Sequence, residues 1–226
     1  IEPSAGNLSF SSLKELSNNC IFLDIRPENE LITECDYLQY IPPKKEQFQK
    51  IHVIGNPPFG RQSSLAIKFI KKSCEFADSI SFILPKSFKK DSMQKKFDKY
   101  FHLLYEIDLP ENSFFCDEEK INVPCVFQIW KRENYTRPTI ENLEPNGFLF
   151  VKKSENPDIS FRRVGVNAGT ISNDINKNIQ SHYFIKFTDS EKRELFNNLV
   201  FPTNNTVGPK SISKKEIIKA IQNIDV

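Results

Sequence analysis

The stretch His52-Val53-Ile54-Gly55-Asn56-Pro57-Pro58-Phe59-Gly60 decides the fold of this chain. A short β-branched run ends at Gly55, and two consecutive prolines follow soon after it. Proline has a fixed φ and no backbone N–H, and the residue before a proline is driven toward extended conformations. The stretch therefore predicts a buried strand that ends near Gly55 and a stiff, non-helical loop over residues 56–59. In open α/β sheets, ligands bind at this carboxyl edge of the strands.

The loop after this strand offers hydrogen-bond acceptors and an aromatic ring. An exocyclic amino group on a flat ring is a weak nucleophile, because its lone pair is delocalised into the ring. The Asn56 side-chain oxygen and the Pro57 carbonyl, directed at its hydrogens, would favour a pyramidal nitrogen with a localised lone pair. Phe59 would stack on the ring and hold it. The alternative interpretation is a proline-rich turn after a buried strand, with no ligand.

Asn-Pro-Pro-Phe after a hydrophobic strand resembles motif IV of the S-adenosyl-L-methionine (AdoMet)-dependent amino methyltransferases, chiefly the N6-adenine enzymes. The resemblance covers residues 1–132 and implies AdoMet as the cofactor. It implies a catalytic role for Asn56, Pro57, Pro58 and Phe59, with Asn56 also lying against the cofactor. No metal is implied, because the sulfonium of AdoMet is already a good leaving group.

The first ten residues read as the end of a strand, a tight turn of small residues and the start of a helix. Such a turn lets a cofactor approach the backbone closely. It resembles motif I of the same family, which cradles the methionine part of AdoMet. The resemblance assigns this role to Glu2, Pro3, Ser4, Ala5 and Gly6. The family usually has a second glycine where this chain has Leu8, which predicts altered or reduced cofactor binding.

Two short strands are predicted downstream of this turn, and each contains an acidic residue, Asp24 at the end of the first and Asp36 within the second, over residues 34–38. A short apolar strand ends in Asp24, and a carboxylate at such a strand tip can accept hydrogen bonds from both ribose hydroxyls of a nucleoside. A solvated acid in a turn is the alternative. By resemblance, Ile25 belongs to the cofactor site, and Asp36 matches the motif III acid, which accepts from the adenine amino group of AdoMet. Tyr37 or Leu38 would then flank the adenine ring.

Basic and aromatic residues are predicted near the entrance of the site. Five lysines lie close to Phe88 in the sequence, namely Lys86, Lys89, Lys90, Lys95 and Lys96. Basic residues interleaved with an aromatic suit a phosphate backbone, so Lys86 is expected to bind substrate; a solvated surface is the alternative. Phe114 and Phe115 lie in a polar loop between two predicted strands. The loop resembles motif VIII, in which an aromatic packs on the opposite face of the target base. Either phenylalanine suits this role, or both pack in the core.

A repeating order of strand and helix accounts for residues 1–132. Helices are expected over residues 62–77 and 92–101, and strands over residues 79–84, 102–109 and 123–130. The pattern predicts an α/β fold with a doubly wound, Rossmann-like methyltransferase sheet, mostly parallel. Residues 133–226 lack this order and are expected to form a small C-terminal α+β appendage that helps to hold the target.

The expected appendage has strand-like runs at residues 147–151, 159–166 and 182–187, and helices at about 190–200 and 212–223. Arg162 and Arg163 precede a small-residue turn that extends to Thr170, and N–H groups in such a turn can meet phosphate. The cofactor motif comes first, the catalytic loop next and the recognition segment last. This order resembles the gamma arrangement of amino methyltransferases, although their DNA-reading domains are usually larger.

Composition narrows the class of protein. The net charge is +2, from 31 basic and 29 acidic residues, so any nucleic-acid surface must be local. The five cysteines show no C-x-x-C spacing and the three histidines are scattered, so neither a zinc site nor a disulfide framework is expected. Reduced cysteines, no visible signal peptide and no apolar run near 18 residues predict an intracellular protein without a membrane partner. It would be cytoplasmic, or nuclear in a eukaryote. The chain begins at Ile1 without Met, so preceding residues are expected.

The leading functional expectation is an AdoMet-dependent N6-adenine methyltransferase that acts on nucleic acid. The gamma-like order favours DNA, and the small tail keeps RNA open. A protein glutamine-N5 methyltransferase uses a similar loop, often with Tyr at the position of Phe59. A catalytically silent nucleic-acid-binding subunit is the alternative that Leu8 favours. The sequence leaves the oligomeric state open.

Overall fold

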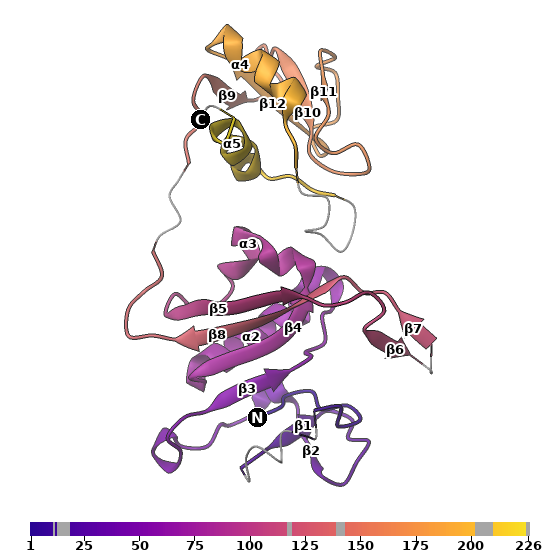
Figure 1. The fold of residues 1–226 in the computed structure, drawn as a ribbon, viewed down its shortest axis with the longest axis vertical. Coiled ribbons are helices and arrows are strands. Elements are labelled where there is room, and N and C mark those ends of the chain that lie inside the picture. The colour runs from indigo at the N-terminus through magenta and orange to yellow at the C-terminus, as the bar shows by residue number, and fades with distance from the viewer. Residues whose placement is uncertain (11, 13–18, 117–118, 139–142, 202–209, 225–226) are drawn as a thin grey trace. The chain divides into compact units, whose positions relative to one another are not determined.

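A computed structural model describes residues 1–10, 12, 19–116, 119–138, 143–201 and 210–224 (Figure 1). The fold is mixed α/β, with several sheets and few helices. The chain divides into two compact units, Ile1–Thr139 and Ile140–Val226. This division lies close to the boundary expected after residue 132, and each unit is described by itself.

The central sheet of the first unit has four strands in the order β3-β4-β8-β5. The strands are β3 (His52–Gly55), β4 (Ser79–Pro85), β5 (Phe101–Asp108) and β8 (Cys125–Arg132). β3 and β4 are parallel, and β8 runs antiparallel to both of its neighbours. The strand predicted to end near Gly55 therefore forms and ends there.

A second, two-stranded parallel sheet consists of β1 (Phe22–Asp24) and β2 (Ile32–Glu34). Ile1 and Glu2 lie between this sheet and β3. On one side, the Ile54 N–H donates to the Ile1 carbonyl at 3.0 Å; on the other, the Leu23 N–H donates to the Glu2 carbonyl at 2.9 Å. Backbone hydrogen bonds thus run from β2 through β1 and residues 1–2 to β3, β4, β8 and β5.

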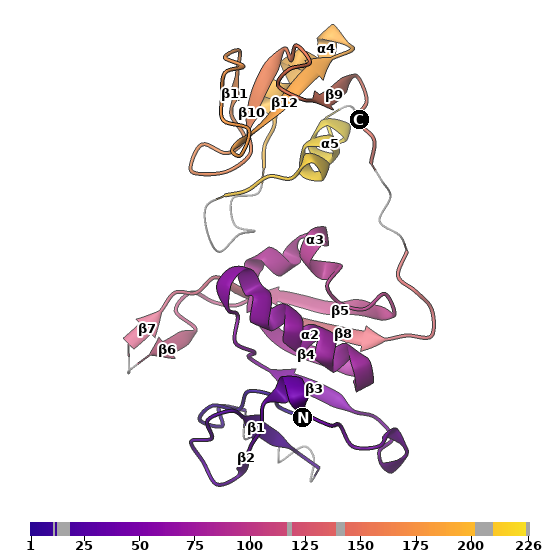
Figure 2. The same cartoon turned by 180° about the vertical axis from the view of Figure 1, so that it is seen from behind.

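Helix α2 (Ser64–Phe76) packs against one face of the four-stranded sheet. Its buried residues Ala66, Phe69 and Ile70 share a core with Val53 and Phe82. Figure 2 shows α2 in front of the strands, and Figure 1 shows the opposite face, over which no helix of the described residues lies. A doubly wound sheet has helices on both faces. Among the described residues, a helix lies over one face of this sheet, whereas the sequence pattern predicts helices over both faces.

The remaining helical segments of the first unit are short. They are η1 (Tyr37–Gln39), η2 (Lys45–Gln47), η3 (Arg61–Ser63), η4 (Lys86–Lys89) and α3 (Asp91–Gln94). The helix expected over residues 92–101 is therefore wrong in length, since α3 ends at Gln94 and β5 begins at Phe101. A hairpin of β6 (Phe114–Cys116) and β7 (Glu119–Ile121) precedes β8.

The second unit is a four-stranded antiparallel sheet with helices. Its strand order is β11-β10-β12-β9. The elements are β9 (Phe148–Val151), β10 (Ile159–Arg162), β11 (Ile171–Ser172), β12 (His182–Phe187), α4 (Ser190–Leu195), η5 (Phe196–Asn198) and α5 (Lys214–Gln222). Ser213 and Glu216 form a capping box at the start of α5. Ile217 and Ile221 of α5 join a core with Phe148 and Phe161. Strands and helices thus occur in the regions where the sequence predicts them.

A polar side chain lies inside the first unit. Gln128 of β8 is fully buried, donates to Glu106 Oε2 at 2.6 Å and to the Phe88 carbonyl at 3.2 Å, and accepts from Trp130 Nε1 at 3.0 Å. Trp130 in turn stacks on Phe97, with ring centroids 4.0 Å apart. One amide therefore joins β8 to β5 and to η4.

We predict that Gln128→Leu lowers the free energy of unfolding of the first unit. Leucine fills a similar volume but leaves the Trp130 N–H and the Phe88 carbonyl without a partner, at about 1–3 kcal/mol for each buried group. Urea denaturation followed by the fluorescence of Trp130, the single tryptophan, measures this. Gln39→Leu, at an exposed position, is the control. Equal losses in the two variants would contradict the prediction.

Candidate cofactor and amino-group site

Three chain segments meet at the carboxyl ends of β1, β3 and the strand of residues 1–2. The Gly6 N–H donates to Asp24 Oδ2 at 2.9 Å, which fastens the small-residue turn to the end of β1. The Ser4 hydroxyl donates to the Asn56 carbonyl at 3.0 Å, which fastens the same turn to the loop after β3. The structure therefore brings together the predicted cofactor turn, Asp24 and Asn56.

Two buried acceptors in this region have no donor among the described residues. Glu2 is 3% exposed and its Oε2 is buried without a hydrogen bond; the Asn56 Oδ1 is likewise buried and unpaired. Burial raises the pKa of Glu2 to about 7, the Ile1 amine acts in the opposite direction, and the Asp24 carboxylate raises this pKa further. Each unsatisfied buried acceptor costs about 1–3 kcal/mol, and a ligand would reach either atom only if its side chain turned outward.

The side chains that meet here suit a ligand rich in donors. Asp24 is held by two backbone N–H groups, that of Gly6 on Oδ2 and that of Arg26 on Oδ1 at 2.9 Å. Each carboxylate oxygen retains a further acceptor position. The carboxyl oxygens of Glu2 and Asp24 accept hydrogen bonds, as phosphate oxygens do, so hydroxyl and ammonium groups fit this site better than a pyrophosphate does.

Leu8 takes the backbone conformation that favours glycine. Its φ is 66°, in the left-handed region, while the neighbouring Gly6 has φ 52°. The Leu8 side chain is buried in a small apolar cluster with Ala5, Phe22 and Ile32. The turn thus has the backbone geometry of a glycine-containing turn, and the extra side chain contributes to packing.

The Asn56 loop is fixed to the start of α2 and is followed by strained backbone. Pro57 is buried and Phe59 is half-buried against the core, while the Phe59 carbonyl accepts from the N–H groups of Leu65 at 3.1 Å and Ala66 at 3.3 Å. Next along the chain, Gln62 has φ 53° and Ser63 has φ 61°. Non-glycine residues in this region cost about 1–3 kcal/mol each and concentrate at functional sites.

Tyr37 does not present its ring to this site. The side chain is 2% exposed, and its hydroxyl lies 2.7 Å from Ser73 Oγ on α2. Burial raises the pKa of Tyr37, as expected for a phenol in the core. The expectation that Tyr37 flanks a cofactor is therefore corrected, and half-buried Leu38 is left as the candidate. Asp36 is exposed and accepts from the Leu38 N–H at 2.9 Å.

The remaining aromatic and apolar candidates are accessible. Phe115 is 67% exposed, so the interpretation that both phenylalanines pack in the core is wrong; Phe114 is half-buried. Figure 1 shows their hairpin at the edge of the sheet to which β3 points. Ile25 and Pro58 are also exposed. These positions agree with ligand contact without testing it.

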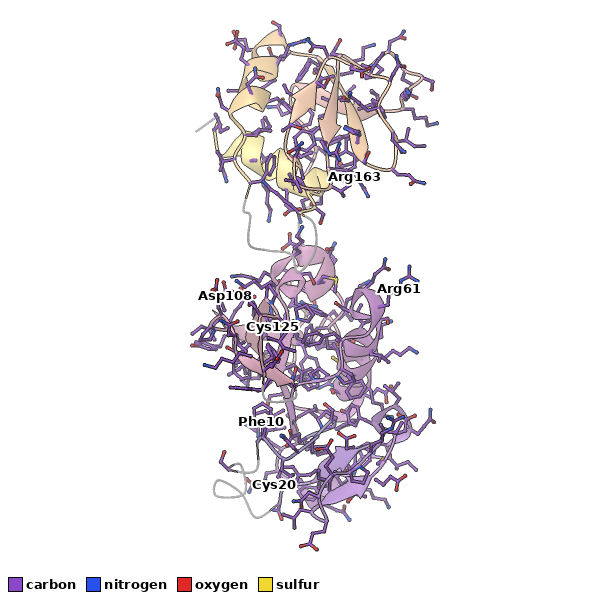
Figure 3. All side chains as sticks on the ribbon, turned by 90° about the vertical axis from the view of Figure 1, so that its right-hand side faces the viewer. Phe10, Cys20, Arg61, Asp108, Cys125 and Arg163 are labelled. Atoms are coloured by element: carbon purple, nitrogen blue, oxygen red, sulfur yellow. The ribbon has the colours of Figure 1, made fainter. Side chains whose placement is uncertain are left out.

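Two of the five lysines near Phe88, Lys86 and Lys89, pair with a carboxylate. Lys89 Nζ lies 2.8 Å from Asp108 Oδ1, and Lys86 Nζ lies 3.3 Å from Asp108 Oδ2. The hydrogen bond from Lys89, together with that from Lys86, holds the pKa of Asp108 below its usual range. Figure 3 shows where Asp108 lies in the first unit. Phe88 is fully buried rather than available for stacking. The ion pair with Asp108 weakens the expectation that Lys86 binds phosphate. In the sequence, the only sign of this partner is that two acids, Glu106 and Asp108, alternate along a predicted strand.

A cavity of about 720 Å³ lies at the other ends of these strands. Its lining includes Ile21, Ile51 and His52, and of the predicted site residues only Glu2. Within the described residues, no group of three or more His, Cys, Asp or Glu side chains is arranged to hold a metal ion. None of the described helices is long and apolar enough to cross a membrane.

Comparison with known proteins adds no assignment to this geometry. No protein-family model matches the chain, and no curated protein matches it significantly. The functional interpretation therefore depends on the motifs of the chain and on the contacts described above.

We predict that Gly60→Ala destabilises the first unit more than Gly6→Ala. At Gly60, with φ 68°, an added Cβ would lie 2.9 Å from Leu65 Cγ and 3.1 Å from the Leu65 nitrogen. At Gly6, with φ 52°, it would meet nothing within 4 Å, so only the backbone strain of about 1–2 kcal/mol remains. Urea denaturation of both variants measures the difference. Equal destabilisation would contradict the prediction and would show that Leu65 moves aside for the added Cβ.

Proposed function

We propose that this chain is an AdoMet-dependent methyltransferase that acts on the N6 amino group of adenine in nucleic acid, with DNA favoured. The observation that carries the proposal is the buried, unpaired Asn56 Oδ1 at the end of β3. The Ser4 hydroxyl fixes the backbone of the same residue, at 3.0 Å from the Asn56 carbonyl. An acceptor held in place and left without a donor suits an amino group that arrives with the substrate.

The cofactor turn supports AdoMet rather than a phosphate-bearing cofactor. AdoMet carries an ammonium group, a sulfonium and a ribose diol, and when bound it supplies an electrophilic methyl group. Glu2 and Asp24 offer carboxylate oxygens to such donors and would repel a pyrophosphate. Pro3, Ser4, Ala5 and Gly6 would form the wall of this site. The backbone of Leu8 already has a left-handed φ, which counters the interpretation of a silent subunit with a broken cofactor turn.

The strand order supports a Rossmann-like methyltransferase sheet. The hydrogen-bonded order is β2, β1, residues 1–2, β3, β4, β8 and β5, with β8 antiparallel. The direction of strand succession reverses between residues 1–2 and β3. Ligands bind at such a switch point, outside the carboxyl ends of the strands. The turn and the Asn56 loop flank this point.

Some residues of the loop would bind the substrate, and others would polarise its amino group. Asn56 Oδ1 and the Pro57 carbonyl would accept from the amino group and localise the nitrogen lone pair. Phe59 would stack on the base, and exposed Phe115 is the better placed of the two hairpin phenylalanines to reach a ligand. An adenine in a duplex must first leave the stack, at a few kcal/mol, and stacking returns about 1–3 kcal/mol per base.

We predict that Asn56→Ala lowers kcat by about two orders of magnitude or more, because a preorganised acceptor acts chiefly in the transition state. AdoMet affinity should change little. The measurement is single-turnover transfer from tritiated AdoMet to duplex DNA, single-stranded DNA, RNA and a mixed protein extract. Phe59→Ala is the matched comparison, with its loss mainly in substrate binding.

The decisive substrate control replaces adenine with purine, which lacks the amino group. Methylation that persists on the purine oligonucleotide, or wild-type turnover by Asn56→Ala, would refute the N6-adenine assignment. Transfer only to RNA would redirect the proposal to an RNA enzyme, and transfer only to protein would favour the glutamine-N5 alternative.

We predict that AdoMet affinity rises with pH through the pKa of Glu2. Burial places that pKa at about 7, and a bound cation favours the ionised carboxylate, so binding lowers the pKa and releases a proton. Affinity should therefore increase by up to about tenfold per pH unit below pH 7 and level off above it. Calorimetry from pH 5.5 to 8.5 measures the profile. Glu2→Gln should flatten it, whereas Glu34→Gln, an exposed control, should not; a profile unchanged in Glu2→Gln would contradict the linkage.

A further inference from the structure

Two cations converge on one tyrosine ring in the second unit. The Arg163 guanidinium carbon lies 5.3 Å from the Tyr183 ring centroid, and Lys214 Nζ lies 5.7 Å from it. Lys214 Nζ is also 4.8 Å from the ring centroid of Phe150, which packs edge-on against Tyr183 at 5.7 Å. Arg163 Nη1 donates to the Tyr183 hydroxyl at 3.3 Å. Two cations thus share one tyrosine ring.

Secondary structure fixes these side chains. Phe150 lies on β9 and Tyr183 on β12, and both pack at the margin of the core that α5 covers. Lys214 begins α5, and its side chain is exposed. Arg163 follows β10, and its N–H donates to the Ser181 carbonyl at 3.0 Å. Lys214 therefore belongs to a helix, and Arg163 is held just after β10 by backbone hydrogen bonds with Ser181 and Ile212.

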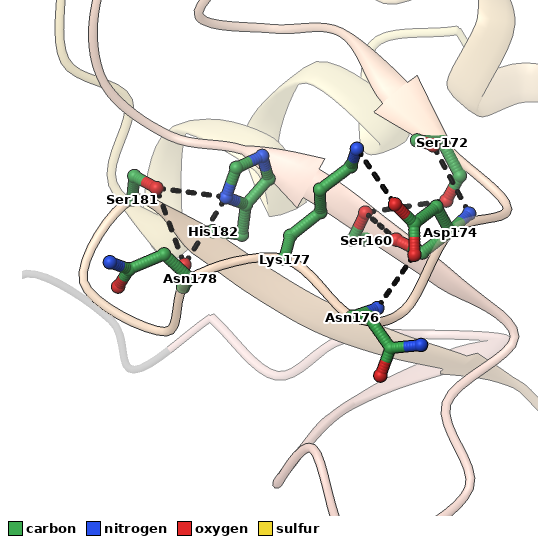
Figure 4. A network of polar contacts seen from close by, with 8 residues as sticks. All are labelled: Ser160, Ser172, Asp174, Asn176, Lys177, Asn178, Ser181 and His182. Carbon is green, nitrogen blue, oxygen red and sulfur yellow. Dashed lines mark hydrogen bonds and ion pairs between the residues drawn. The ribbon is translucent and has the colours of Figure 1, made fainter.

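The loop before β12 is itself held by polar contacts (Figure 4). Lys177 pairs with Asp174 at 2.8 Å, and Asp174 also accepts from the Asn176 N–H at 2.9 Å. The Ser181 hydroxyl lies 2.9 Å from His182 Nδ1, which lies 3.2 Å from the Asn178 carbonyl. This network orients the backbone at Ser181, to which Arg163 is bonded.

The positive charge of this surface is not neutralised. Within the described part of the chain, neither Arg163 nor Lys214 forms an ion pair with a carboxylate, in contrast to Lys86 and Lys89. A cation over a ring retains its charge and its outward N–H donors. Arg163 Nε is buried without an acceptor among the described residues. The site therefore has donors in excess and attracts anions.

Three N–H groups of the backbone turn after Arg163 are used within the second unit. The Gly165 N–H donates to the Lys210 carbonyl, the Ala168 N–H to the Gly165 carbonyl and the Gly169 N–H to the Arg162 carbonyl. These donors are used within the unit. The same bonds place residue 210 beside the turn, where Lys210 Nζ lies 5.8 Å from the ring centroid of Phe201.

We propose that the second unit binds the phosphates of a nucleic-acid strand through an aromatic–cation patch, defined as Phe150, Arg163, Tyr183 and Lys214. The proposal rests on the proposed function, for which it names the surface that holds the substrate. Cations supply the phosphate contacts, and the rings of Phe150 and Tyr183 hold these cations without neutralising their charge. Interleaved charge and aromatic surface fits a nucleic-acid strand better than an acidic peptide.

The test is fluorescence anisotropy of the full chain with a short labelled single-stranded oligonucleotide, from about 50 to about 200 mM salt. Lys214→Gln should weaken binding by about threefold and flatten the slope of log affinity against log salt by about 0.7, the value for one lost contact. Lys214→Arg should restore both quantities. Lys186→Gln is the matched control, because Lys186 is an exposed lysine of β12 and the substitution changes charge equally. Lys214 is exposed, so circular dichroism should show each variant folded.

Each outcome decides the proposal. Wild-type slopes in Lys214→Gln, equal effects of the two lysine substitutions, or no binding by the wild-type chain would overturn it. If Lys214→Gln lost binding to labelled polyglutamate but kept binding to the oligonucleotide, the result would also overturn the proposal, in favour of an acidic protein partner. Binding through the patch without methyl transfer would refute the proposed function alone. Methyl transfer to an oligonucleotide with an unchanged KM in Lys214→Gln would refute the patch alone.

Discussion

The two-residue strand of Ile1 and Glu2 is the constraint on which the candidate site depends. Its backbone carbonyls accept from Ile54 on one side and from Leu23 on the other, so β1 and β3 are held one strand apart. Because the strands keep this spacing, Asp24 and Asn56 at their ends reach the same small-residue turn. The bonds from Gly6 to Asp24 and from Ser4 to Asn56 then close the arrangement.

This region concentrates features that cost stability. Glu2 Oε2 and Asn56 Oδ1 are buried acceptors without donors, and Gln62 and Ser63 have left-handed backbone. Such costs, of about 1–3 kcal/mol each, persist where the surrounding packing leaves no alternative. Here α2 and its core supply that packing. A proline-rich turn with no ligand explains the stop of β3, but it gives no reason for two unsatisfied acceptors at adjacent strand ends.

Local rules predicted part of this structure, and long-range contacts decided the rest. The end of β3 followed from Gly55 and the two prolines, whose effects act on neighbouring residues. The burial of Tyr37 depends on Ser73 of α2, and the neutralisation of Lys89 depends on Asp108 of β5. Neither partner is close in sequence, so periodicity and spacing do not identify either pair. For the second pair, the sequence shows only that Glu106 and Asp108 alternate along one strand and therefore lie on the same face of it.

The position of lysine in the fold, more than its number, determines where an anion can bind. The whole chain carries a net charge of only +2, so most basic residues are balanced somewhere. Lys86 and Lys89 face Asp108, and a salt-bridged ammonium attracts phosphate only weakly. Lys214 instead lies over aromatic rings, which have a quadrupole but no net charge to cancel it. Lysines that look alike in sequence therefore differ in their surroundings, since a carboxylate offsets the charge of Lys86 and Lys89 and aromatic rings leave that of Lys214 in place.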